Sequence, residues 1–167
     1  MKIGILTVSD KGARGEREDR SGPAVRKIME AAGAEIVQTG VVADEKALIS
    51  AVLVKWSGEG LDLILTTGGT GFSPRDVTPE ATRAVIEREA PGLAEVMRRA
   101  GMDKTPTAML SRAAAGIRES TLIVNLPGSE KGARESLEAI LPALGHGIEI
   151  LKGTASECGK PAPKDQP

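Results

Sequence analysis

Aromatic side chains are almost absent from this sequence of 167 residues, and so is any excess of positive charge. Trp56 and Phe72 are the only aromatic residues, too few to form the stacking surfaces on which single-stranded nucleic acid binds. The 22 lysines and arginines are balanced by 23 aspartates and glutamates, so the formal net charge is −1. Because no basic surplus is available for a phosphate backbone, we expect no nucleic-acid partner.

Cysteine and long apolar runs are equally scarce. Cys158 is the single cysteine, so no intrachain disulfide can form, which is typical of proteins in a reducing compartment. The apolar part of the N-terminal segment "MKIGILTVSD" is too short for a signal peptide. No other segment approaches the ~20 apolar residues of a membrane-spanning helix. We therefore expect a cytoplasmic protein without a membrane partner.

What the sequence does contain is typical of a globular domain, with 40% hydrophobic and 27% charged residues. Strand-like apolar runs alternate with segments of helical periodicity. The strands are predicted at 2–8, 34–42, 61–67 and 121–126, with a less regular pattern at 112–117. The helices are predicted to begin at Ser21, Asp44 and Thr78, to cover 90–101, and to follow residue 131 with either a break or a bend at Pro142.

This order predicts a mainly parallel sheet with helices on both faces, since parallel neighbours need crossover connections. We expect one α/β domain over residues 1–153, built as a three-layer α/β/α sandwich. Residues 154–167 are polar and rich in proline, a composition that predicts a disordered tail.

The loops that follow the predicted strands carry most of the chemically active side chains. In a parallel sheet these loops meet at one edge, where ligands bind. The first two strands are followed by Ser9-Asp10 and by Asp44. The other two lead into Gly68-Gly69-Thr70-Gly71 with Arg75 and Asp76, and into Asn125, Pro127, Gly128, Ser129 and Lys131. Three carboxylates, two glycine-containing turns and two cations are thus predicted to converge.

These groups suit phosphoryl or nucleotidyl transfer. Glycines allow backbone N–H groups to approach phosphate oxygens. Mg²⁺ is usually bound by one or two carboxylates together with substrate phosphates, and Asp44 and Asp76 could supply the carboxylates. Lys131 or Arg75 could neutralise charge on a leaving pyrophosphate.

Each of these signals also has a purely structural interpretation. The glycine stretch fits neither the Walker nor the Rossmann pattern, and a tight strand-to-helix turn explains it equally well. Asp44 could simply cap a helix, and Asp10 could be a solvated carboxylate at a strand end. Ser111-Arg112 could contact phosphate, or it could be a capping serine beside a surface arginine. The charged segment 11–20 is either a solvated loop or a lid.

Six motifs in a fixed order point to a known family. They are "TVSD", "EDRSGP", "VVADE", "TTGGTGFSPRDVTPEAT", "PTAMLSRAAAGI" and "IVNLPGS". Over roughly residues 2–152 the chain resembles the molybdopterin adenylyltransferase family, the MogA/MoaB-type proteins of molybdenum cofactor biosynthesis. The resemblance implies the molybdopterin-binding fold and a homotrimer. It also implies transfer of AMP from MgATP to the terminal phosphate of molybdopterin, with release of pyrophosphate, ahead of molybdate insertion by a pathway partner.

The resemblance assigns roles to individual residues. It implies that Asp44 and Asp76 are catalytic and hold Mg²⁺. It places the ligand-binding residues at Asp19, Ser21, Gly22, Gly68, Gly69, Thr70, Gly71, Ser111, Asn125, Pro127 and Gly128. Strand-end topology adds Ser9, Asp10 and Ser129 as ligand-binding candidates.

Three functions remain open on sequence alone. The first is a molybdopterin adenylyltransferase that uses MgATP. The second is a non-catalytic, MoaB-type molybdopterin-binding or carrier protein of the same pathway. The third is a structural trimer in which the loops are only turns. Paired carboxylates next to bound phosphate favour the enzyme, because a carrier gains nothing from them.

Overall fold

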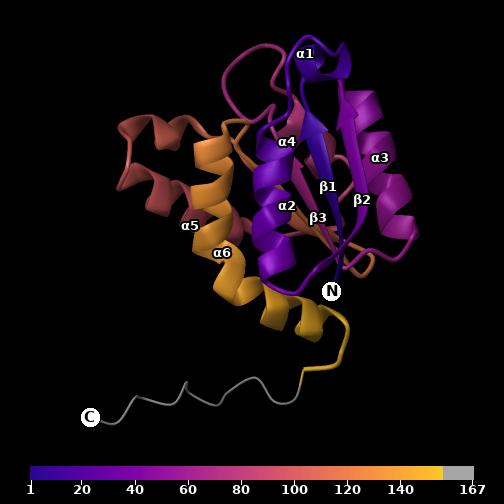
Figure 1. Cartoon of the computed structure of the whole chain (residues 1–167). Coiled ribbons are helices and arrows are strands. Elements are labelled where there is room, and N and C mark those ends of the chain that lie inside the picture. Colours follow the sequence, from indigo (N-terminus) through magenta and orange to yellow (C-terminus); the bar gives the residue numbers. More distant parts are fainter. Residues whose placement is uncertain (156–167) are drawn as a thin grey trace.

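The structure is a computed structural model in which residues 1–155 are described, so most of the predicted tail lies outside the described residues. Strands and helices alternate along the chain (Figure 1). In order they are β1 (Lys2–Val8), α1 (Asp10–Ala13), α2 (Ser21–Ala31), β2 (Glu35–Val42), α3 (Lys46–Gly58), β3 (Leu63–Thr67), α4 (Thr78–Arg83), β4 (Arg88–Glu89), α5 (Pro91–Met102), the 3₁₀ helix η1 (Pro106–Leu110), β5 (Ala115–Arg118), β6 (Thr121–Leu126) and α6 (Glu130–Leu151).

The strands form one sheet in the order β2-β1-β3-β6-β5-β4. The first four strands of this order are parallel, as predicted. β5 runs antiparallel to β6, and the two-residue β4 runs antiparallel to β5. The weak pattern at 112–117 therefore marks a strand, although it begins at Ala115, and β4 has no sequence signal of its own.

Helices cover both faces of the sheet, which confirms the three-layer sandwich (Figure 1). Side chains of β3 alternate between the faces, as the pleat requires. Leu63 and Leu65 pack in the core beneath α2, α5 and α6, whereas Ile64 packs in the core beneath α3 and α4. Because β3 is covered on both sides, all five of its residues are buried. This burial explains why its first three residues are all aliphatic and why the strand does not alternate between apolar and charged residues.

The helix ends follow local sequence rules in part. Ser129 caps α6, since its Oγ accepts a hydrogen bond from the N–H of Gly132 at 3.1 Å. Pro79 lies in the first turn of α4, where a proline costs no hydrogen bond. α6 continues through Pro142 but changes direction in its later part, the bend that an internal proline predicts (Figure 1). Within residues 1–155, no helix has the length and apolar character needed to cross a membrane.

Candidate active site

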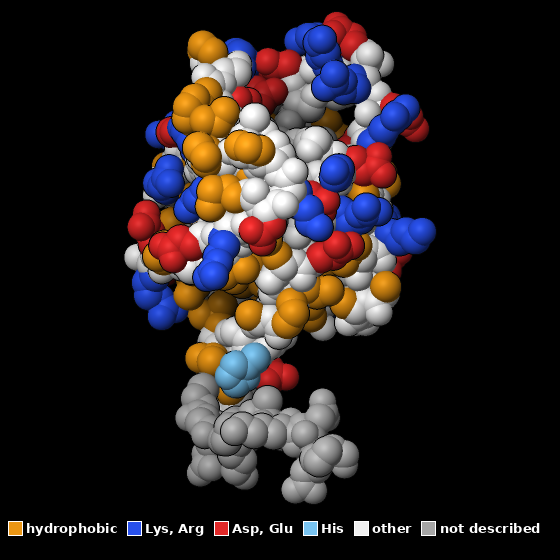
Figure 2. Space-filling model, turned by 90° about the vertical axis from the view of Figure 1, so that its left-hand side faces the viewer, with side chains coloured by type: hydrophobic (Ala, Val, Ile, Leu, Met, Phe, Trp, Pro, Cys, Tyr) orange, Lys and Arg blue, Asp and Glu red, His pale blue; other side chains and the backbone are white. Residues whose placement is uncertain are grey.

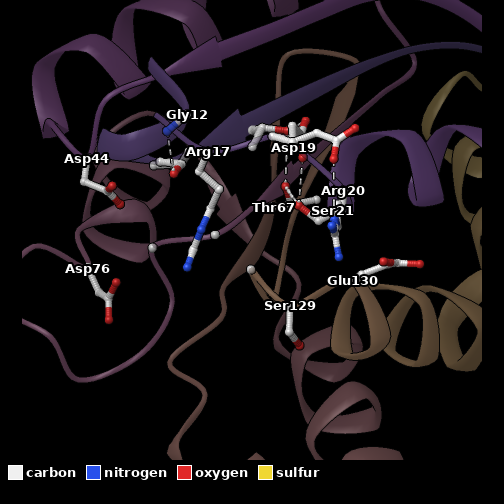
Figure 3. Close-up of a pocket in the computed structure, with 17 residues that line it drawn as sticks. Gly12, Arg17, Asp19, Arg20, Ser21, Asp44, Thr67, Asp76, Ser129 and Glu130 are labelled. Carbon is white, nitrogen blue, oxygen red and sulfur yellow. Dashed lines mark hydrogen bonds and ion pairs between the residues drawn. The ribbon is translucent and has the colours of Figure 1, made fainter. Parts of the chain in front are cut away.

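A cavity of about 720 Å³ opens where the parallel strands end. Its walls come from separate parts of the chain: residues 7–9 with Gly12, the segments 17–21, 67–69 and 128–130, and the loops that carry Asp44 and Asp76. Figure 3 shows side chains from these segments pointing into the shared space. In Figure 2, charged side chains gather around a hollow at the end of the molecule that carries α1. The predicted convergence of the strand-end loops is thus present in the fold.

Asp44 is held by the loop that follows β1. Its carboxylate accepts a hydrogen bond from the backbone N–H of Asp10 at 2.7 Å, and its own N–H donates to the carboxylate of Asp10 at 3.0 Å. The residue before α3 is Glu45, and no side chain caps that helix. The interpretation of Asp44 as a helix cap is therefore wrong, and its half-buried carboxylate lines the cavity instead.

Asp10 was predicted to bind ligand, but it is not among the residues that line the cavity. Its carboxylate accepts two hydrogen bonds from the guanidinium of Arg75, at 2.9 and 2.8 Å. This ion pair ties the loop after β1 to the loop that carries Asp76. Asp10 therefore organises the two catalytic candidates from outside the cavity, and Arg75 is already engaged by a carboxylate.

The charges of this cluster shift its pKa values in opposite directions. Burial raises the pKa of Asp44, and although the N–H of Asp10 opposes this, the nearby charges of Asp10 and Asp76 raise it further. The hydrogen bonds from Arg75 hold the pKa of Asp10 below its usual value. Negative charge at Asp44 is thus unfavourable without a counter-charge, which is the condition under which a bound cation is stabilised.

Asp76 lies at the end of the turn that follows the glycines. Its carboxylate accepts a hydrogen bond from the N–H of Ser73 at 2.9 Å, and the opposite backbone bond, from the N–H of Asp76 to the carbonyl of Ser73, closes the turn at 2.9 Å. Asp76 is half-buried and lines the cavity. The two carboxylates predicted to be catalytic therefore face one space (Figure 3).

Arg112 fixes the turn that carries Asp76 through hydrogen bonds to its backbone. Its guanidinium donates to the carbonyl of Gly71 at 2.7 Å and to the carbonyl of Asp76 at 2.5 Å, and it forms an ion pair with Glu80 of α4. Its N–H donates to the carbonyl of Thr70 at 2.8 Å. The sequence offered a phosphate contact or a surface arginine for this residue. Its groups are used instead to fix both ends of the segment between the glycines and Asp76.

The glycine turn is both a tight turn and a wall of the cavity. Gly68 and Gly69 have φ angles of +97° and +64°, a region that other residues rarely adopt. A Cβ on Gly68 would lie 2.2 Å from the carbonyl oxygen of Val8. A Cβ on Gly69 would lie 2.2 Å from Oγ1 of Thr78 and 3.1 Å from Oδ1 of Asp44. Close approach of the backbone to β1 and to Asp44 therefore requires glycine at both positions.

A hydrogen-bond network centred on Asp19 forms another part of the wall of this cavity. The carboxylate of Asp19 accepts from Oγ1 of Thr7 at 2.6 Å, from the N–H of Gly22 at 3.0 Å and from the hydroxyl of Ser21 at 3.2 Å. Ser21 also bonds Thr67 at 2.9 Å. Ser21 is thus the first residue of α2 rather than its cap. Asp19 and Ser21 line the cavity, whereas Gly22 packs against Asp19 just outside it.

The remaining residues that were predicted to bind ligand line two different cavities. A second cavity of about 270 Å³ lies among α5, η1 and α6, and most of its lining is apolar. The predicted residues on its wall are Thr70, Gly71, Ser111, Pro127 and Ser129. On the wall of the first cavity are Ser9, Gly68, Gly69, Gly128 and, again, Ser129.

Asn125 lines neither cavity. Its fully buried amide donates to Thr66 at 3.0 Å and to Thr82 at 2.8 Å, and it accepts from the N–H of Ala114 at 3.2 Å. These bonds satisfy the amide within the protein and join β6 to β3, to α4 and to the residue just before β5. The structure therefore gives this predicted ligand-binding side chain a structural role.

The donor set around Asp44 and Asp76 fits a hard cation. Both residues offer carboxylate oxygens, and the buried Oγ1 of Thr78, which lies beside Gly69, has no hydrogen-bond partner within the described residues. In that part of the chain no group of three or more histidine, cysteine, aspartate or glutamate side chains is placed to hold a metal. Asp44 and Asp76 would therefore hold Mg²⁺ together with oxygens from a substrate, the usual arrangement for this ion.

Comparison with known proteins identifies the class to which this fold and site belong. Residues 4–146 match the family described as "Probable molybdopterin binding domain", and the chain belongs to this family. The molybdopterin adenylyltransferase of Helicobacter pylori strain J99 is 43% identical over 156 residues, which cover 92% of this chain and 89% of that protein. The molybdopterin adenylyltransferase of Haemophilus influenzae is 42% identical over 159 residues, covering 93% and 80%.

A solved structure shares the fold throughout. The molybdopterin biosynthesis enzyme MoaB of Thermus thermophilus superimposes with a TM-score of 0.87 at 57% sequence identity, covering 91% of this chain and 96% of that one. The expected molybdopterin-binding fold is therefore confirmed.

Proposed function

We propose that this protein is a molybdopterin adenylyltransferase: it transfers AMP from MgATP to the terminal phosphate of molybdopterin and releases pyrophosphate. The observation that carries the proposal is the placement of Asp44 and Asp76 on one cavity beside the glycine turn. Adenylyltransferase relatives that match about 90% of the chain support it.

The residues around the cavity suit a reaction that needs positioning rather than a protein base. An oxygen of the pterin phosphate forms a bond to the α-phosphorus of ATP while the bond from that phosphorus to the α–β bridging oxygen breaks in line. A phosphate monoester is already anionic near neutral pH, so no side chain has to remove a proton. Mg²⁺ held by Asp44 and Asp76 would neutralise charge on the phosphates. The protein contributes mainly orientation and preorganised charge.

The second cavity offers a place for a ring system. Its lining includes Met97, Ala108, Leu110 and Ala113, and it shares Ser129 with the first cavity. An organic ring bound there would be stabilised by apolar contacts and would leave its phosphate near the glycine turn. A ring held by these aliphatic side chains would need no aromatic stacking partner, in keeping with a chain that has only two aromatic residues.

We also propose a homotrimer in the cytoplasm that passes its product to a partner in molybdate insertion. Exposed apolar side chains on α5 and η1 support self-association, namely Val96, Met102, Met109 and Leu110. Figure 2 shows hydrophobic side chains gathered on one part of the face that it presents. Light scattering coupled to size-exclusion chromatography tests this, with a mass near three chains expected and a monomer contradicting it.

The carrier function is less favoured. A protein that only holds molybdopterin has no use for two carboxylates that face one cavity and whose mutual repulsion contributes to the raised pKa of Asp44. It would also have no use for the ion pair between Asp10 and Arg75 that keeps the loops of both carboxylates in place.

A single reaction separates the two functions. Protein, Mg²⁺, ATP labelled at the α-phosphate and freshly prepared molybdopterin are mixed anaerobically, and the pterin is isolated by chromatography. Label in the pterin fraction that depends on Mg²⁺ is the expected result. Tight pterin binding without label transfer would overturn the adenylyltransferase proposal in favour of a carrier.

A further inference from the structure

The cavity has more negative than positive side chains on its walls. Among the described residues, five carboxylates line it, and the only cations that do so are the guanidinium groups of Arg17 and Arg20. The carboxylates are those of Glu18, Asp19, Asp44, Asp76 and Glu130. A nucleoside triphosphate keeps a net negative charge even with one Mg²⁺ bound. A site of this composition therefore needs at least one further cation that is free to contact phosphate.

Four arginines on or near the cavity are already engaged by carboxylates. They pair as Arg14 with Glu16, Arg20 with Glu18, Arg75 with Asp10, and Arg112 with Glu80. Lys131, an initial candidate for charge neutralisation, is not on the cavity wall.

Arg17 differs from all of these. Within residues 1–155 it makes no hydrogen bond and no ion pair. Figure 3 shows its side chain extending from the loop after α1 into the cavity, toward the space between Asp76 and Ser129. The glycine turn and the start of α6 border that space. Within the described residues an unpaired guanidinium thus faces a space that the glycine turn and the N-terminus of α6 border.

We propose that Arg17 binds the pyrophosphate leaving group of the nucleotide, an inference that rests on the proposed adenylyl transfer. Guanidinium groups bind phosphate through two parallel, charge-assisted hydrogen bonds. When the α–β phosphate bond breaks, the electron pair stays on the departing pyrophosphate and its negative charge grows. A cation at that position stabilises the transition state more than the bound substrate, so Arg17 acts on kcat. The charged segment 11–20 then serves as one wall of the site.

The test uses two variants and a control in the same loop. Arg17→Met removes the charge and keeps an unbranched stem, and Arg17→Lys keeps the charge without the two-pronged geometry. Lys11→Met removes one positive charge from an exposed residue that does not line the cavity, so it controls for the general field of the loop. Circular dichroism and thermal unfolding confirm that all three variants are folded.

The first measurement is binding of inorganic pyrophosphate with Mg²⁺ by titration calorimetry, which requires no turnover. We expect Arg17→Met to weaken pyrophosphate binding by at least about tenfold. The affinity of Arg17→Lys should lie between those of Arg17→Met and the wild type, and that of Lys11→Met should equal the wild-type value. In the adenylylation assay kcat should fall by about 10²-fold in Arg17→Met. Wild-type pyrophosphate affinity in Arg17→Met would overturn the proposal.

The assay also identifies which phosphate Arg17 contacts. A rise in the KM for molybdopterin alone, with pyrophosphate affinity unchanged, would assign Arg17 to the pterin phosphate and overturn the assignment to the leaving group. If the wild-type protein binds pyrophosphate through Arg17 but transfers no label to pterin, the adenylyltransferase proposal fails and this contact stands. The two proposals are therefore tested separately.

Discussion

Asp10 and Asp44 each accept the backbone N–H of the other, across 34 positions of sequence. Because Arg75 holds the same Asp10 carboxylate, the loops that carry Asp44 and Asp76 are joined through one residue that stays outside the cavity. Asp10→Ala should therefore lower kcat by about tenfold or more, since small displacements of reacting groups are costly. Steady-state kinetics measures this. Arg75→Met removes only part of the arrangement, so an Arg75 variant slower than the Asp10 variant would contradict this explanation.

Replacement of either cavity carboxylate tests the centre of the proposed reaction. Asp44→Asn and Asp76→Asn keep the side-chain shape, so both proteins should fold, but each removes one negative ligand for the cation. We expect adenylyl transfer to fall by about 10²-fold or more in each, with a higher Mg²⁺ requirement. The labelled-ATP assay at several Mg²⁺ concentrations measures both. Turnover equal to the wild type in both variants would exclude these residues from the mechanism.

Arg112 should act as a positioning residue. Arg112→Met releases the carbonyls of Gly71 and Asp76, so the turn that carries Asp76 should become mobile while the distant core is unaffected. Arg112→Lys keeps a charge for Glu80 but cannot reach both carbonyls, and should have an intermediate effect. Hydrogen exchange of residues 70–76 measures the mobility of this turn, and kcat measures its effect on the reaction. Unchanged exchange together with reduced kcat would indicate a direct role for Arg112 in chemistry.

Gly68 and Gly60 form a matched pair for the glycine turn. Both have positive φ, +97° and +77°, but a Cβ meets the Val8 carbonyl only at Gly68 and meets nothing at Gly60. Gly60→Ala should lower the free energy of unfolding by about 1–2 kcal/mol, which is the strain of the left-handed conformation alone. Gly68→Ala should lower it further, because the backbone also has to shift away from β1. Urea unfolding compares the two, and equal losses would mean that the contact with Val8 has no energetic effect.

Asp62 makes the stability of the fold depend on pH. Burial raises its pKa, but the ion pair with Lys152 at 2.5 Å and the N–H of Lys2 at 2.7 Å outweigh burial, and the pKa is lowered. The stabilisation is therefore complete above the unfolded-state pKa of about 3.9 and is lost as the pH falls through the lower folded-state pKa. Asp62→Asn should lower the free energy of unfolding by about 1–2 kcal/mol at pH 7 and by a smaller amount at pH 3, where part of the stabilisation is already lost.

Urea unfolding at pH 7, 5 and 3 measures this difference, with Asp103→Asn, an exposed carboxylate, as the control. A constant gap between Asp62→Asn and the wild type at all three values would contradict the assignment.

The sequence predicted the architecture because local physics decides it. β1, β3 and β6 could be predicted because each contains consecutive aliphatic residues, as expected where both faces of the sheet are covered. The glycine turn could be predicted because glycine readily adopts positive φ angles such as those of Gly68 and Gly69. β4 could not be predicted because a strand of two residues has no periodicity and forms only by pairing with β5. Asn125 was placed at a ligand turn, yet as a residue within β6 it is buried and bonded to Thr66 and Thr82.

The site was predicted less completely, for a related reason. Asp44 and Asp76 could be found because each follows a strand or a glycine turn. The partners that hold them could not, since Asp10 and Arg75 are 65 positions apart and no local pattern links them. Arg17 lies in a charged segment and Arg112 follows a serine in a mostly apolar one, and neither pattern indicates what the guanidinium contacts. Only the fold distinguishes Arg112, which fixes a loop, from Arg17, which lines the cavity and has no ion-pair partner within residues 1–155.

The cavity walls begin at residue 7 and end at residue 130. During synthesis the site therefore cannot close until most of the chain has left the ribosome and the last strand and α6 have docked. A molecule that binds there recognises only the finished fold and stabilises it by mass action. A supply of the ligand would therefore increase the fraction of chains that are folded, in addition to supporting turnover.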